Sequence, residues 1–233
     1  MAFMKKKAVL FDIDGTILNC NKAGKHSLIQ SCLDVFGTIG KMEMVDFQGK
    51  TDPLILTESL SAMGFSDEII KNGTEKLKEK YFSHLEEKIG KYDTVVLPGI
   101  PELLKAISLN ENIILGVLTG NFRRSAEIKL KAAGVKEYFP FGAYGDDAPN
   151  RNDLPPVAKK RISEIYGIDI NFEDIFIIGD TVYDIECAKK SGAVSISVGT
   201  GWADKEKLFS YQPDYFFDDL SDTEKVLSIF LNS

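Results

Sequence analysis

Two aspartates separated by a single residue, Asp12 and Asp14, follow an apolar run at residues 8–11. Side chains alternate along a strand, so two carboxylates at this spacing face the same side. They repel each other unless a cation lies between them or one of them is protonated. Gly15 comes next, and glycine can adopt backbone conformations that let the chain leave a sheet. Alone, this pattern would also fit a solvated turn, so its meaning depends on the later parts of the chain.

Polar clusters also end three later apolar runs, and a further aspartate lies in the helix expected after the second of them. These clusters are Thr119-Gly120-Asn121, Gly179-Asp180-Thr181 with Asp184, and Gly199-Thr200-Gly201. The carboxyl ends of strands in an open parallel sheet line one crevice, where ligands bind. Several carboxylates there suit a hard divalent cation with oxygen ligands, and we expect magnesium. A cation together with backbone N–H groups at a helix start predicts a phosphate site.

The hydrophobic pattern predicts the elements that would position these clusters. A strand is expected from residue 8 to the turn at Gly15, and further strands at residues 113–118, 138–144, 175–178, 194–198 and 215–217. Helices are expected at residues 123–133, 157–166, 184–191 and 222–231. Near-continuous apolar runs alternating with helices are typical of a parallel sheet covered on both faces. The predicted fold class is therefore α/β, with a doubly wound parallel sheet.

A different pattern separates the first strand from this alternation. Residues 19–93 have a mostly helical pattern, with helices predicted at residues 21–36, 53–63 and 67–89. Pro53 suits a first helical turn, and Thr51 or Asp52 can cap that helix. We therefore expect a catalytic core made of residues 1–18 and 94–233, and a helical cap domain made of residues 19–93.

The composition limits the class of protein. The chain has 233 residues, a net charge of −7 and 44% apolar residues, which is ordinary for a globular protein and argues against a nucleic-acid binder. No apolar run is long enough to cross a bilayer, so no membrane partner is expected. The cysteines, Cys20, Cys32 and Cys187, are unevenly spaced and indicate neither a zinc site nor disulfides, which favours a cytoplasmic location. A monomer and a homodimer are both compatible with the sequence.

The motif D-I-D-G-T at residues 12–16 resembles the first motif of the haloacid dehalogenase-like hydrolase superfamily. Thr119 matches the second motif of that superfamily, a Ser or Thr at a strand end. The fourth motif, G-D-x-x-x-D, matches Gly179, Asp180 and Asp184. The helical insert resembles the cap of the phosphoglycolate-phosphatase-like branch, so the resemblance covers nearly the whole chain. The third motif, a Lys-Pro in a short proline-rich stretch, is missing, and residues 147–156 stand in its place.

This resemblance implies a magnesium-dependent phosphatase that hydrolyses a small phosphorylated metabolite, such as phosphoglycolate or a sugar phosphate. Asp12 would be the nucleophile that forms an aspartyl-phosphate, and Asp14 would be the general acid/base. Magnesium would be held by Asp12, by the backbone carbonyl of Asp14 and by Asp180. Asp184 would bind the metal through water or would orient Asp180. A cap of this type closes over the crevice and determines the substrate.

A basic residue must replace the missing lysine, because a fixed cation stabilises the charge on the transferring phosphoryl group. Aligning Pro155 with the second proline of the third motif puts Asn152 at the lysine position and Arg151 one residue before it. Arg151 is our candidate, since its long side chain can bind phosphate through two parallel hydrogen bonds. The alternatives in the following helix are Lys159 and Lys160. The other groups expected at the phosphate are Thr119, Gly120 and Asn121.

One cap residue is a candidate for the substrate. Lys50 lies between two predicted cap helices, in the stretch 49–52, which resembles the substrate-specificity loop of this cap type. We expect Lys50 to reach the substrate, although a solvated lysine beside a helix cap would fit its position equally well.

Other activities fit the same pattern. A phosphomutase differs mainly in whether water reaches the phospho-enzyme. A phosphonate hydrolase would need a Schiff-base lysine in the cap, and a dehalogenase would need neither a metal nor Asp14. Outside enzymes, a phospho-accepting receiver domain also gathers aspartates and a Thr or Ser at strand ends, but it is much shorter. A binding protein without turnover is the remaining alternative, and the retention of all four carboxylates argues against it.

Overall fold

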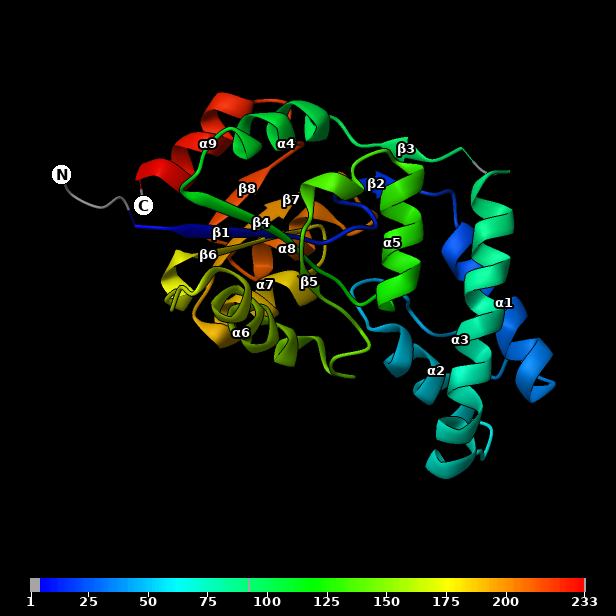
Figure 1. Ribbon diagram of the computed structural model, residues 1–233. Coiled ribbons are helices and arrows are strands. Elements are labelled where there is room, and N and C mark those ends of the chain that lie inside the picture. Colours follow the sequence, from blue (N-terminus) through cyan, green and yellow to red (C-terminus); the bar gives the residue numbers. More distant parts are fainter. Residues whose placement is uncertain (1–4, 92, 233) are drawn as a thin grey trace.

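A six-stranded sheet lies between two layers of helices, and a group of three further helices stands beside one end of it (Figure 1). The computed structural model describes residues 5–91 and 93–232. Residues 1–4 and Ser233 of the predicted core, and Tyr92 of the predicted cap, therefore lie outside the described residues. None of the described helices is long and apolar enough to cross a membrane.

All strand pairings in the sheet are parallel, and the strand order is β5-β4-β1-β6-β7-β8. The strands are β1 (Lys7–Phe11), β4 (Ile113–Leu118), β5 (Gly142–Ala143), β6 (Ile175–Gly179), β7 (Val194–Val198) and β8 (Tyr215–Phe217). Because β1 lies between β4 and β6, the polar clusters that follow these strands meet at one edge of the sheet. The predicted α/β fold with a doubly wound parallel sheet is confirmed.

Alternate side chains of the strands belong to two separate hydrophobic cores. In β1, Val9 and Phe11 belong to one core, and Ala8 and Leu10 belong to the other. Helices cover both sides of the sheet, which explains why the strand sequences are apolar at nearly every position (Figure 1). These helices are α4 (Ile100–Ser108), α5 (Arg123–Ala132), α6 (Leu154–Tyr166), α7 (Val182–Ser191), α8 (Lys205–Ser210) and α9 (Thr223–Asn232).

The three helices of the predicted cap, called the cap below, stand apart from the sheet (Figure 1). They are α1 (Ala23–Phe36), α2 (Asp52–Ser61) and α3 (Asp67–Ile89), each within two residues of its predicted bounds, and α5 of the core packs against α3. A short antiparallel ribbon, β2 (Leu18–Asn19) with β3 (Val95–Val96), brings the two ends of this helical segment side by side. Aromatic contacts join cap and core, since the Phe122 ring lies 6.2 Å from Tyr81 and 6.3 Å from Phe82 between centroids.

Four parts of the core differ from the prediction. The stretch 138–144, expected to be extended, forms a strand only at Gly142–Ala143, because β5 is a short edge strand and Tyr138 lies in a 3₁₀ turn (Lys136–Tyr138). Helix α6 begins at Leu154 rather than residue 157, since proline is tolerated in a first helical turn. Helices α4 and α8 were not predicted, although the buried residues of α4, Ile100, Leu103, Leu104 and Ile107, have helical spacing.

Candidate active site

The turn after β1 holds Asp12 between neighbouring strands. The backbone N–H of Asp12 donates to the carbonyl of Ile178 in β6 at 2.9 Å, and its side chain is buried. Gly15 has a φ of 83°, which favours glycine, and a methyl group at this position would overlap the Asp180 carboxylate. The glycine of the first motif therefore allows the first and fourth motifs to approach each other closely.

Three buried carboxylates, those of Asp12, Asp180 and Asp184, form one cluster, in which one oxygen from each lies within 4.8 Å of the other two. Burial raises the pKa of Asp180 well above its ordinary range, and repulsion from Asp12 and Asp184 raises it further. Burial also raises the pKa of Asp12 to about 6, although the charge of Arg151 opposes this shift. An all-oxygen donor set whose members repel one another fits a hard divalent cation such as Mg²⁺.

Asp184 is largely occupied by protein partners. Its Oδ2 accepts hydrogen bonds from the backbone N–H of Thr181 at 3.1 Å and from Thr181 Oγ1 at 2.6 Å, which forms a capping box at the start of α7. Its Oδ1 pairs with the guanidinium of Arg151. Asp184 is therefore held by protein groups and is placed to orient the cluster. The carboxylate of Asp180 accepts a longer hydrogen bond, of 3.3 Å, from Thr16 Oγ1.

Arg151 lies beside the nucleophile candidate. It begins the 3₁₀ turn Arg151–Asp153 before α6, and its side chain is only 5% exposed. Its Nη2 lies 3.2 Å from Asp12 Oδ1, and its Nη1 donates to the carbonyl of Gly49 in the cap at 3.1 Å. The two alternative candidates point elsewhere, since Lys159 pairs with Asp169 at 3.1 Å and Lys160 with Glu164 at 3.6 Å. Of these three basic residues, the structure places Arg151 at the carboxylate cluster.

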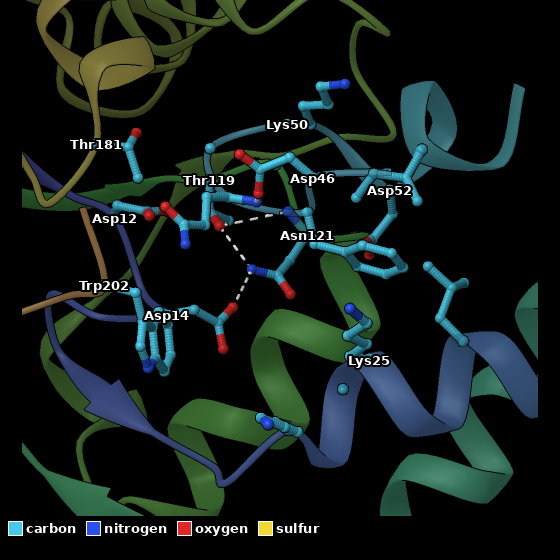
Figure 2. Close-up of a pocket in the computed structure, with 18 of the residues that line it drawn as sticks. Asp12, Asp14, Lys25, Asp46, Lys50, Asp52, Thr119, Asn121, Thr181 and Trp202 are labelled. Carbon is cyan, nitrogen blue, oxygen red and sulfur yellow. Dashed lines mark hydrogen bonds between the residues drawn. The ribbon is translucent and has the colours of Figure 1, made fainter. Parts of the chain in front are cut away.

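The loop after β4 carries a hydrogen-bonded set of side chains (Figure 2). Asn121 Nδ2 donates to Asp14 Oδ2 and to Thr119 Oγ1, both at 2.8 Å, and the backbone N–H of Asn121 donates to Thr119 Oγ1 at 3.3 Å. The amide hydrogens of Asn121 are thus directed at its neighbours. The hydroxyl hydrogen of Thr119 remains able to donate to an oxygen in the pocket.

Lys129 of α5 is a site residue that the sequence reasoning missed. Its Nζ lies 2.5 Å from Asp14 Oδ2 and 2.6 Å from Asn121 Oδ1, and the side chain is buried. The available signal was its position, because Lys129 follows the buried residues Phe122 and Ala126 on one face of the helix. A lysine on an apolar helix face is rarely buried without a partner.

A pocket of about 340 Å³ lies between the strand ends and the cap. Its lining brings together these predicted site residues: Asp12, Asp14, Lys50, Thr119, Gly120, Asn121, Arg151 and Asp180. The cap adds apolar side chains, among them Leu28, Val45 and Phe47, and the loop after β7 adds the half-exposed Trp202.

The structure gives Lys50 and Gly120 contacts that the sequence did not predict. Lys50 Nζ pairs with Glu58 Oε2 of α2 at 2.6 Å, and its amino group points away from Asp12 and Asp14 (Figure 2). The carbonyl of Gly120 accepts from the backbone N–H of Asp52 at 2.8 Å, and a methyl group at Gly120 would overlap the backbone of Lys50. Gly120 therefore allows the cap loop to lie directly against the core.

Comparisons with known proteins agree with this geometry. The model of a family described as haloacid dehalogenase-like hydrolase matches residues 9–198. The pyrophosphatase PpaX of Bacillus mycoides (strain KBAB4) is 25% identical over 226 residues, covering 97% of this chain and 98% of its own length. The PpaX pyrophosphatase of Bacillus cereus (strain Q1) is 26% identical over 229 residues, with coverages of 97% and 98%.

Solved structures share the fold. A hydrolase from Pseudomonas syringae superposes with a TM-score of 0.71 at 22% identity, covering 96% of this chain and 99% of its own. CbbY from Rhodobacter sphaeroides, determined in complex with phosphate, gives a TM-score of 0.68 at 17% identity, with coverages of 93% and 96%.

Proposed function

The chain belongs to the haloacid dehalogenase-like hydrolase family, and we propose that it is a Mg²⁺-dependent phosphatase acting through an aspartyl-phosphate. The observation that carries the proposal is the position of Asp12. Its buried carboxylate lies 3.2 Å from the guanidinium of Arg151 and within one cluster with Asp180 and Asp184. A carboxylate nucleophile, a fixed cation and an oxygen-donor cluster are the groups that phosphoryl transfer requires.

The reaction would proceed in two displacements. In the first, a carboxylate oxygen of Asp12 attacks phosphorus, and the bond from phosphorus to the leaving-group oxygen breaks while Asp14 gives that oxygen a proton. In the second, Asp14 takes a proton from water, the water oxygen attacks phosphorus, and the bond to Asp12 breaks to release phosphate. Asp14 lines the same pocket as Asp12 and is partly exposed, which suits a group that exchanges protons with substrate and water.

Other side chains of the pocket would bind the phosphoryl group. Arg151 and the hydroxyl of Thr119 would donate hydrogen bonds to its oxygens, where transition-state charge develops. Bound Mg²⁺ would offset the repulsion between the phosphoryl oxygens and the carboxylates. The residues that would hold it are Asp12 and Asp180, together with the backbone carbonyl of Asp14.

The substrate we propose is a small phosphate monoester, of the phosphoglycolate or sugar-phosphate kind. The pocket volume of about 340 Å³ is at the lower end of the range for small-molecule sites, which supports a small metabolite. Pyrophosphate is a second candidate, because two relatives that match over nearly their whole length are pyrophosphatases. A phosphomutase would use the same Asp12 chemistry but would return the phosphoryl group to a second hydroxyl.

The proposal is tested by following phosphate release from monoesters and from pyrophosphate, with Mg²⁺ or with a chelator. We expect release only with Mg²⁺, and a fall of at least about 10³-fold in Asp12→Asn, which lacks the attacking oxygen but keeps the side-chain shape. Asp169→Asn, a change at an exposed residue, is the matched control. Full activity in chelator or in Asp12→Asn would contradict the proposal, and a rearranged ester formed without phosphate release would indicate a mutase.

A further inference from the structure

Lys129 is a buried cation that takes no part in the steps above. Burial alone would lower its pKa, but the Asp14 carboxylate, with Tyr81 and Cys20, raises it above the ordinary lysine value. The side chain is therefore charged and is 5% exposed. Burying an ammonium group costs free energy unless it is closely paired. The partners of Lys129 must therefore compensate for its burial.

These contacts converge on the proposed acid/base. Lys129 Nζ donates to Asp14 Oδ2 at 2.5 Å and to Asn121 Oδ1 at 2.6 Å. Asn121 Nδ2 donates to the same Asp14 oxygen at 2.8 Å, which closes a ring of three side chains. The other Asp14 oxygen faces the Cys20 thiol at 3.7 Å. Asp14 is thus fixed from the side of α5, whereas Arg151 contacts Asp12 and Asp184 and not this ring.

The cap leaves room for this lysine. A methyl group at Gly24, in the first turn of α1, would lie 3.1 Å from Lys129 Nζ, a contact tight enough to displace it. The lysine therefore occupies a space shared by the core helix α5 and the cap helix α1, and it lines the active-site pocket there.

We propose that Lys129 is a positioning residue, which with Asn121 holds the Asp14 carboxylate in the orientation that proton transfer with the leaving-group oxygen requires. This inference rests on the phosphatase function proposed above. Its consequence is specific. Loss of Lys129 slows the step in which Asp14 gives a proton to the leaving oxygen, and that step matters most for leaving groups that are strongly basic.

The test uses four aryl phosphates of similar shape, the 4-nitrophenyl, 4-chlorophenyl, phenyl and 4-methoxyphenyl esters, whose leaving groups become progressively more basic. We compare kcat/KM, because it includes the first displacement but not the second, in which Asp14 acts on water for every ester alike. In Lys129→Met we expect kcat/KM for the phenyl ester to fall about 10²-fold or more, and kcat/KM for the 4-nitrophenyl ester to fall less than about tenfold. Lys131→Met, an exposed lysine of the same helix, should behave like the wild type for all four esters.

Lys129→Arg provides a second variant that keeps the buried charge, and folding of both variants is checked by thermal unfolding. Because arginine places its donors differently, we expect a dependence of kcat/KM on the leaving group that is steeper than in the wild type and shallower than in Lys129→Met. A wild-type dependence in both variants would overturn the inference. An equal loss for all esters with weaker inhibition by inorganic phosphate would also overturn it, by making Lys129 a phosphate ligand. Wild-type protein that hydrolyses none of the esters would instead overturn the proposed function, and this inference with it.

Discussion

The carboxylates of this site are buried together, so they need a positive charge close to them. Asp12, Asp180 and Asp184 share one cluster, and Arg151 supplies positive charge to two of them. Burial raises the pKa of Asp12 to about 6, and the charge of Arg151 opposes that rise. Substitutions of these residues should therefore have different effects on kcat and on the free energy of unfolding.

Arg151→Lys tests most directly which residue supplies the positive charge for the phosphoryl group. Lysine keeps the charge but cannot contact Asp12, Asp184 and the Gly49 carbonyl together from a planar fork, so we expect kcat at saturating substrate to fall about 10²-fold or more. Lys159→Met should retain nearly normal kcat, because that side chain pairs with Asp169. If Arg151→Lys kept normal kcat while Lys159→Met lost it, the phosphoryl-binding charge would come from α6.

Asp180→Asn should reduce activity and increase the stability of the fold. In chelator, removing a buried carboxylate whose pKa is raised by burial and by its acidic neighbours should stabilise the fold by at least about 1 kcal/mol, or about 2–4 °C in Tm. Mg²⁺ should raise the Tm of the wild type, and the same variant should lose this increase. Thermal unfolding with and without Mg²⁺ measures both effects, and an equal response to Mg²⁺ in the two proteins would remove Asp180 from the metal site.

The start of α2 links the cap to the core through hydrogen bonds. Thr51 Oγ1 accepts from the backbone N–H of Leu54 at 3.2 Å and donates to the carbonyl of Pro149 at 2.6 Å, so one hydroxyl caps the helix and links it to the core. Asp52 Oδ2 accepts from the backbone N–H of Phe122 at 2.8 Å. The loop that carries Lys50 is therefore tied to the loop that carries Thr119 and Asn121.

Asp52 should make this junction sensitive to pH. Burial raises its pKa to about 6 from an ordinary value of 3.8, although Lys129 and the Phe122 N–H oppose the shift. A raised pKa means that the folded state binds the proton more tightly, so its contribution to stability is present at low pH and is lost as pH rises through about 6. Between pH 4 and pH 7 the wild type should lose about 2 kcal/mol relative to Asp52→Asn.

Denaturant unfolding of both proteins across this pH range measures the difference, with Asp67→Asn, a change at an exposed residue in the first turn of α3, as the control. Asparagine keeps an acceptor for the Phe122 N–H, so the comparison isolates the charge. A difference between wild type and Asp52→Asn that stays constant with pH, or that grows at low pH, would contradict this role for Asp52.

For the whole molecule, the apolar runs and the motif order were sufficient to predict the parallel sheet and the three cap helices. Arg151 could be proposed because aligning Pro155 with the second proline of the third motif puts Arg151 one residue before the lysine position, and the structure places it at Asp12. The helical spacing of Lys129 could have indicated that it is buried, but its pairing with Asp14 depends on how α5 packs between the sheet and the cap, which the local sequence does not encode. The pairing of Lys50 with Glu58 likewise depends on how the loop folds back on α2.

The proposed mechanism depends on Asp12 as the residue that carries the phosphoryl group. The most direct measurement mixes the protein with Mg²⁺ and substrate, quenches it during turnover, reduces acyl phosphates with borohydride and locates the reduced side chain by peptide mass spectrometry. We expect reduction of the carboxyl group at Asp12, and none in Asp12→Asn treated in the same way. Reduction at Asp14 or at any other residue, or no reduction in protein that is turning over substrate, would contradict the account.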